Sequence, residues 1–275
     1  MDAGLQGRVA LVTGASGAIG AAIARMLAAE GARVALHYNA SGGKVAALLR
    51  ESALAGTGAF TVQADLSRPT EVSRMFDEIE AAAGHVGVMI CNAGRLVETP
   101  VPLARMTLEQ WNDTLEQNLT GTFLTLRRFM QGLEASGIPD PSVVIVGSMS
   151  GVWGQPGHAD YAAAKAALVH GLTPTLKDEI VRIAPQGRVN TIAPGFIVSP
   201  MIRNKLQETE TMRKVLQTAS LRKFGLPEDV AAMATFLASN RLSGHITGEV
   251  IRMAGGKEGR VLFEPDEIDM ERAGG

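Results

Sequence analysis

The chain has 275 residues, of which 46% are hydrophobic and 20% are charged, and its formal net charge is −2. This size and composition allow a buried core without disulfides or metal, and we expect one domain over residues 1–256 followed by a tail, 257–275. The charge balance and the lack of a Lys/Arg cluster argue against nucleic acid as a partner. With no secretory signal pattern, no run near the roughly 18 apolar residues of a membrane span and a single cysteine, Cys91, we expect a cytoplasmic protein that does not enter a membrane.

Short β-rich runs alternate with stretches of helical periodicity along the chain. The predicted strands span residues 9–12, 33–38, 59–63, 86–91, 143–146, 188–192 and 250–253. The predicted helices span residues 19–30, 43–55, 69–83, 107–134, 158–183 and 227–239. This alternation is typical of βαβ units. It predicts an α/β fold with a doubly wound parallel sheet of about seven strands and helices on both faces.

Local signals mark two helix starts and one interruption. Ser67 precedes Pro69, and Thr107 is followed three positions later by Gln110 in a capping-box pattern. Pro174 lies inside the helix predicted at 158–183, where it removes one backbone hydrogen bond and should kink the helix.

The stretch TGASGAIG, residues 13–20, joins the first predicted strand to the first predicted helix. A glycine-rich turn at this place lets the backbone approach a pyrophosphate, which the free N–H groups of the following helix then bind. Taken alone, the same turn is compatible with a tight strand-to-helix connection that binds nothing.

Further polar residues follow the predicted strands in a fixed order. They are Asp65 after the third strand, Asn92, Ala93 and Gly94 after the fourth, Asn118 in the long helix, Ser148 after the fifth, Tyr161 and Lys165 in the next helix, and Pro194 and Gly195 in the sixth connection. With the glycine turn, this set resembles the short-chain dehydrogenase/reductase family over residues 6–256. Ala18 stands where the short, single-domain branch of that family usually carries its middle glycine. The resemblance implies a Rossmann-type fold and an NAD(P)-dependent oxidoreductase.

Four residues are the catalytic candidates: Asn118, Ser148, Tyr161 and Lys165. Tyr161 and Lys165 are four positions apart, so they share one helix face, and an ammonium there would lower the pKa of the phenol toward its working range. Ser148 should emerge at the C-terminal edge of the sheet, where its hydroxyl can bond a substrate oxygen. The resemblance adds Asn118, from which a water would connect Lys165 to solvent.

The resemblance also assigns the cofactor site. Its predicted members are Gly14, Ser16, Gly17, Ile19, Tyr38, Asn39, Ser41, Asp65, Leu66, Asn92, Ala93, Gly94, Tyr161, Lys165, Pro194, Gly195, Ile197 and Ser199. The second strand ends without the carboxylate that accepts from the ribose 2′-hydroxyl in NAD enzymes, and Ser41 and Lys44 follow it. We therefore favour NADPH, with NADH as the alternative, and expect no metal.

Substrate and assembly follow from the resemblance in outline. It places the substrate among residues 95–106, 150–158 and 196–221, where Trp153, His158, Met201 and Ile202 predict an apolar cleft for a ketone or secondary alcohol. The activity expected is that of a carbonyl or 3-oxoacyl reductase in a homotetramer or dimer assembled through the helices of Asn118 and Tyr161. The alternatives are an enzyme that uses the cofactor for dehydration or isomerisation, and a nucleotide-sensing protein without turnover. The tail, with six acidic residues, is expected to pack on a neighbouring subunit or to remain loose.

Overall fold

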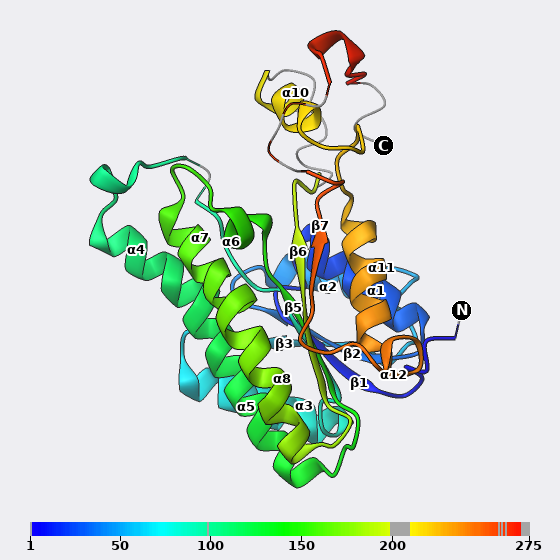
Figure 1. The fold of residues 1–275 in the computed structure, drawn as a ribbon. Helices are drawn as coiled ribbons and strands as arrows, with labels where there is room; N and C mark the ends of the chain where they lie inside the picture. Colours follow the sequence, from blue (N-terminus) through cyan, green and yellow to red (C-terminus); the bar gives the residue numbers. More distant parts are fainter. Residues whose placement is uncertain are drawn as a thin grey trace.

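The structure is a computed structural model that describes residues 2–97, 99–198, 210–257, 259, 261 and 263–270. Seven strands of this part of the chain form one parallel sheet in the order β3-β2-β1-β4-β5-β6-β7 (Figure 1). Their bounds are β1 Val9–Val12, β2 Arg33–Tyr38, β3 Phe60–Gln63, β4 Val88–Cys91, β5 Ser142–Val146, β6 Arg188–Pro194 and β7 Val250–Met253. The predicted doubly wound α/β sheet is confirmed.

The strand order reverses beside β1. Strands β2 and β3 lie on one side of β1, and β4 to β7 lie on the other, so the C-terminal ends of β1 and β4 are neighbours. In open α/β sheets, ligands bind in the crevice outside such a reversal. The fold therefore brings the glycine turn after β1 next to Asn92, Ala93 and Gly94 after β4.

Helices cover both faces of the sheet (Figure 1). Helices α1 Ala18–Ala29, α2 Gly42–Leu49 and α11 Pro227–Ala238 pack on one face, and α3 Pro69–Ala83, α5 Gly121–Ser136 and α8 Thr173–Ile183 on the other. In β1, Ala10 and Val12 face the first group, while Val9 and Leu11 face the second. Because successive side chains of a strand point to opposite faces, both sets must be apolar, which explains the continuous apolar runs.

Two helices predicted as continuous are each divided by a π-helical turn. The first consists of α4 Leu108–Leu115, a π-helical turn Glu116–Thr120 and α5. The second consists of α7 Ala159–Ala166, a π-helical turn Ala167–Leu172 and α8. Single π-helical turns are frequent at functional sites, and the first of these contains Asn118.

Pro174 lies in the first turn of α8, directly after the second π-helical turn. A proline cannot donate the backbone bond that would continue the regular ladder, so the helix changes its hydrogen-bond pattern before it. The predicted change in the backbone hydrogen bonds is confirmed, and the kink stays a prediction. Tyr161 and Lys165 lie upstream of it in the regular helix α7.

Helix starts agree with the prediction at one of two positions. The Thr107 hydroxyl accepts from the backbone N–H of Gln110 at 3.1 Å and caps α4 as expected. Ser67 does not cap α3; Arg68 precedes that helix, because the Ser67 hydroxyl donates to the Asp65 carboxylate instead. Helices α6 Met149–Trp153, α10 Glu210–Gln217 and α12 Asn240–Ser243 were not predicted, and α2 ends six residues earlier than expected.

Residues of the C-terminal tail pack on α10, beyond the C-terminal ends of β6 and β7 (Figure 1). The Gln217 side chain donates to the carbonyl oxygen of Phe263 at 3.0 Å, and the Arg213 guanidinium donates to that of Ile268 at 3.1 Å. A small apolar cluster beneath these bonds contains Val198, Leu216, Phe224 and Ile268. The expectation of a loose tail is wrong for residues 263–270, because their apolar side chains pack on α10 of the same chain. Packing of the tail on a neighbouring subunit stays a prediction.

Candidate active site

The glycine turn between β1 and α1 needs glycine at two positions. Gly14 has φ +65°, and a Cβ there would lie 2.9 Å from the Cα of Ala93. A Cβ at Gly20 would lie 2.4 Å from the carbonyl oxygen of Gly14. Both distances are shorter than real contacts of a Cβ, so the turn can close against the end of β4 only with glycine.

The N-terminus of α1 is suited to a diphosphate. Gly17 precedes the helix, no side chain caps it, and the first turn carries no acidic residue. The unpaired N–H groups of a helix start, with the positive end of the helix dipole, bind anions such as a pyrophosphate. These features fit a dinucleotide, and the predicted residues Gly14, Ser16, Gly17 and Ile19 lie in or beside this turn.

The residues directly after β1 and β4, Thr13 and Asn92, hold the turn in place through their side chains. The Thr13 hydroxyl donates to the carbonyl oxygen of Ile90 at 3.1 Å and accepts from the N–H groups of Asn92 at 2.9 Å and Ala93 at 3.0 Å. The Asn92 side chain donates to the carbonyl oxygens of Thr13 at 2.9 Å and Gly14 at 3.2 Å. Asn92, predicted to line the cofactor, thus also holds the glycine turn through its side chain. Thr13 shares this structural role, which the sequence did not predict for either residue.

Three of the four predicted catalytic residues meet at the C-terminal end of β5. Ser148 follows that strand and begins α6, and its hydroxyl accepts from the N–H of Ser150 at 3.1 Å. Lys165 is buried, and its Nζ donates to the carbonyl oxygen of Val146 at 2.9 Å. The same Nζ lies 5.7 Å from the centre of the Tyr161 ring.

Burial controls the titration of this group. It lowers the pKa of Lys165 to about 8. It also raises the pKa of Tyr161, against a smaller opposing effect of the hydrogen bond with Ser148. The expectation of a lowered Tyr161 pKa is therefore wrong for this structure, because burial of the phenolate raises the pKa more than the hydrogen bond with Ser148 lowers it. Cys91 is a buried core residue, and burial raises the pKa of its thiol to about 12.

Asn118 is fully buried in the first π-helical turn, and among the described residues its side-chain amide bonds only to backbone groups. Its Oδ1 accepts from the N–H of Arg95 at 3.0 Å, and its Nδ2 donates to the carbonyl oxygens of Arg95 at 2.8 Å and Thr114 at 3.0 Å. A Cβ at Gly94 would lie 2.7 Å from this Oδ1 and 3.4 Å from the Nζ of Lys165. Gly94 thus lies where Asn118 and Lys165 converge, and a cavity of about 240 Å³ with Asn118 and Arg95 in its wall lies beside α4.

Asp160, directly before Tyr161, joins α4 to α7 and was not predicted. The residue is 1% exposed. Its carboxylate accepts from the Gln110 side chain at 3.0 Å, from the Thr114 hydroxyl at 2.8 Å and from the N–H of Tyr161 at 2.8 Å. Burial raises the pKa of Asp160, but these hydrogen bonds outweigh it and leave the pKa below its ordinary value. An acidic residue in the first turn of a helix was the signal that could have drawn attention to it.

The remaining predicted cofactor residues border the same edge of the sheet. Tyr38 is half-buried at the end of β2, Asn39 is exposed, and Ser41 precedes α2. The Asp65 carboxylate accepts from the N–H and the hydroxyl of Ser67, and Leu66 packs against the core. Pro194 is the last residue of β6, Gly195 begins the loop that follows, and Ile197 pairs with Gly225. Ser199 lies outside the described residues.

The predicted substrate region is only partly described, because Met201 and Ile202 also lie outside the described residues. Trp153 is 46% exposed at the end of α6. His158 is buried, and its ring nitrogens lie 3.1 Å from the carbonyl oxygen of Val97 and 3.3 Å from that of Pro156. The imidazole therefore connects two loops. His158 is the N-cap residue of α7, but its side chain makes no capping hydrogen bond.

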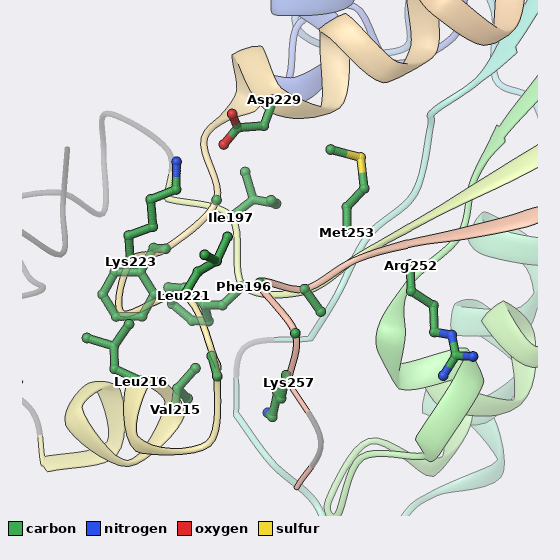
Figure 2. A pocket seen from close by; sticks show the side chains of 16 residues that line it. Phe196, Ile197, Val215, Leu216, Leu221, Lys223, Asp229, Arg252, Met253 and Lys257 are labelled. Atoms are coloured by element: carbon green, nitrogen blue, oxygen red, sulfur yellow. The ribbon is translucent and has the colours of Figure 1, made fainter. Parts of the chain in front are cut away.

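A larger cavity, of about 360 Å³, lies between α10, the loop after β6 and the end of β7, and the catalytic candidates do not line it. Figure 2 shows Phe196, Leu216, Leu221 and Lys223 gathered on one side, with Asp229 at the start of α11. Its wall is mainly apolar and includes residues of the predicted substrate loop.

The described residues contain no group of three or more His, Cys, Asp or Glu side chains arranged to hold a metal ion. Among the helices that the structure describes, none combines the length and the apolar character needed to cross a membrane.

Comparisons with known proteins agree with this geometry. A family model of the short-chain dehydrogenase/reductase type, described as enoyl-(acyl carrier protein) reductase, matches residues 14–258. The chain is 37% identical to the 3-oxoacyl-(acyl-carrier-protein) reductase FabG of Staphylococcus epidermidis over 250 residues, which cover 90% of this chain and 97% of that relative. It is 36% identical to the 3-oxoacyl-(acyl-carrier-protein) reductase of Synechocystis sp. over 255 residues, 92% of this chain and 97% of the relative.

A third relative carries a different substrate in its name. The 3β-hydroxysteroid dehydrogenase 1 of Eggerthella lenta is 35% identical over 253 residues, which cover 92% of this chain and 94% of the relative. The family match spans most of the chain and includes the glycine turn, Ser148, Tyr161 and Lys165. The chain therefore belongs to the short-chain dehydrogenase/reductase family, and it is an oxidoreductase that transfers hydride between a nicotinamide cofactor and a ketone or secondary alcohol.

Proposed function

We propose that this protein reduces the 3-oxo group of an acyl thioester with NADPH. The observation that carries the proposal is the identity of 36–37% to 3-oxoacyl-(acyl-carrier-protein) reductases over nine-tenths of the chain. The cavity beside α10, with its apolar wall, is compatible with a substrate that carries an acyl chain. Reduction to the 3-hydroxyacyl thioester is the direction proposed.

The protonation of the candidate catalytic residues supports this direction. When bound, the nicotinamide supplies the hydride to the carbonyl carbon. Because the pKa of Tyr161 is raised, its phenol carries the proton that a ketone oxygen needs as it becomes an alcohol. Ser148 would orient that oxygen by a hydrogen bond and stabilise the charge that develops on it. Lys165, with a pKa of about 8, is mainly an ammonium at neutral pH and would place a positive charge beside the site.

Residues at the end of β2 support NADPH over NADH. This end carries no carboxylate, and Ser41 leads into the N-terminus of α2, whose first turn has no acidic residue. Lys44 is exposed in the first turn of the same helix. A helix start with a nearby ammonium is suited to a ribose 2′-phosphate, whereas a carboxylate there would repel it. We therefore assign the 2′-phosphate to Ser41 and Lys44.

We also propose that the protein assembles as a homo-oligomer, a tetramer or a dimer. Leu108 on α4, Phe123 on α5 and Val181 on α8 are exposed by 73%, 48% and 41%. These side chains lie on the two long helices that the resemblance assigns to the subunit interface, the one with Asn118 and the one with Tyr161. Sedimentation of the wild type and of a Phe123→Asp variant would test this, because a monomeric wild type would contradict the assignment.

The test of the substrate assignment is a comparison of specificity constants. Purified protein should oxidise NADPH with acetoacetyl thioesters of coenzyme A or acyl carrier protein, and Tyr161→Phe should remove this activity while cofactor binding persists. A 3-hydroxysteroid is the second candidate, favoured by the identity of 35% to a 3β-hydroxysteroid dehydrogenase. A higher kcat/KM for the hydroxysteroid than for any thioester would overturn the first assignment in favour of the second. Binding of cofactor without turnover of either would favour a nucleotide-sensing protein.

A further inference from the structure

A buried histidine, His37, lies near the end of β2, beside the glycine turn. His37 is 2% exposed, and both of its ring nitrogens have backbone partners. The N–H of Gly14 donates to Nδ1 at 3.1 Å, and Nε2 lies 3.0 Å from the carbonyl oxygen of Ala64. A backbone N–H can only donate, and a carbonyl oxygen can only accept. The ring is therefore neutral, with its proton on Nε2.

His37 holds two consecutive amides of the glycine turn. Its side chain accepts from Gly14, and its carbonyl oxygen accepts from the N–H of Ala15 at 2.9 Å. From the opposite side, the Asn92 amide donates to the carbonyl oxygens of Thr13 and Gly14. The backbone N–H groups and carbonyl oxygens in the first half of the turn are thus paired within the protein. The N–H groups at the start of α1 remain for the diphosphate.

We propose that His37 is a positioning residue for the nicotinamide cofactor. The neutral imidazole of His37 holds the Gly14 peptide in the left-handed conformation that shapes the diphosphate-binding turn. Gly14 is free to adopt other conformations, since glycine populates positive and negative φ almost equally. The bond to Nδ1 selects the one at φ +65°. His37 lies beneath the turn and acts through Gly14, without contact to the cofactor.

Two amide variants separate the two bonds of the ring. In His37→Asn, the amide oxygen takes a place near that of Nδ1 and can accept from Gly14, but it does not reach Ala64. In His37→Gln, the longer side chain reaches the place of Nε2 and can donate to Ala64, but it has no acceptor for Gly14. His245→Asn, at an exposed histidine, is the control for the exchange itself.

The measured quantity is the dissociation constant of NADPH, and separately of NADH, from cofactor fluorescence without substrate. We expect His37→Asn to bind within about threefold of the wild type, and His37→Gln to bind roughly tenfold more weakly, as one buried unpaired N–H predicts. At saturating cofactor, the kcat of His37→Gln should match the wild type, so that the loss appears in KM for the cofactor alone.

Either of two results would overturn the proposal. In the first, His37→Gln binds as tightly as the wild type, or both variants weaken equally, which would assign His37 to the junction of β2 and β3 only. In the second, ¹⁵N NMR of the wild type at pH 7 finds the proton of His37 on Nδ1, a test that needs no variant to fold. Because cofactor binding is measured without substrate, a failure of the thioester assignment leaves this test intact.

Discussion

Replacing Asp160 should destabilise the protein and impair catalysis together, because this carboxylate joins α4 to the helix that carries Tyr161. Asp160→Ala removes an acceptor shared by Gln110, Thr114 and the backbone N–H of Tyr161. Hydrogen bonds to a charged group contribute about 1.5–3 kcal/mol each, and donors that stay near the surface recover part of the loss from water. Gln110 is half-buried and Thr114 is buried, so we expect a net loss of about 3 kcal/mol in the free energy of unfolding.

Catalysis should fall because both ends of the network lead to the catalytic group. Thr114 bonds to Asp160 through its hydroxyl and to Asn118 through its carbonyl oxygen, while Tyr161 is bonded directly. A displacement of about 1 Å costs up to roughly 100-fold in rate, so kcat should fall about 10- to 100-fold with little change in cofactor affinity.

The assay combines thermal unfolding, steady-state kinetics and a double-mutant cycle with Thr114→Val. Asp160→Asn keeps the shape and should lose only about 1 kcal/mol, and the cycle should give a coupling energy of about 1–2 kcal/mol between Asp160 and Thr114. Asp178→Ala is the control, because that carboxylate lies on the surface beside Lys177 and should change stability by less than about 0.5 kcal/mol. A wild-type melting temperature and kcat for Asp160→Ala would refute the reasoning.

Three further predictions concern a buried charge, the tail and the cofactor. Lys165→Met should abolish turnover. Because the pKa of Lys165 is lowered to about 8, the unfolded chain binds more protons above that pH, and the contribution of Lys165 to the free energy of unfolding should rise by about 3 kcal/mol between pH 8 and 10.5. Melting curves should show this rise as the difference between wild type and variant, since the raised pKa values of Cys91 and Tyr161 act in the opposite direction in both proteins. Ile268→Ala should lower the local stability of the tail and α10 by about 2–3 kcal/mol, increase hydrogen exchange in α10 and raise KM for the substrate. Val261→Ala, at an exposed residue, is the control and should have none of these effects. Unchanged hydrogen exchange in α10 of Ile268→Ala would contradict this role of the tail. Lys44→Gln should raise KM for NADPH several-fold and leave KM for NADH unchanged, and equal effects on the two would argue against a 2′-phosphate at this position.

The alternation of strands and helices and the order of motifs were sufficient to predict the sheet, the family and the catalytic candidates. Each depends on local pattern: apolar runs long enough for a strand buried on both faces, glycines at a turn, and Tyr161 four positions before Lys165 on one helix face. The catalytic candidates Ser148, Tyr161 and Lys165 meet in space because the C-terminal ends of parallel strands share one edge of the sheet. The sequence by itself therefore determined the fold and the kind of chemistry.

Only the tertiary structure decided which residues hold the site in place and how its groups titrate. His37 and Gly14 are 23 positions apart, and Thr114 and Asp160 are 46 apart, so no local pattern connects them. The pKa of Tyr161 depends on how much water the surrounding loops exclude, and a sequence names the neighbours of a group without stating its burial. For the same reason the tail carried no predictable role until its apolar side chains were seen against α10, since packing between distant segments arises only when the whole chain has folded.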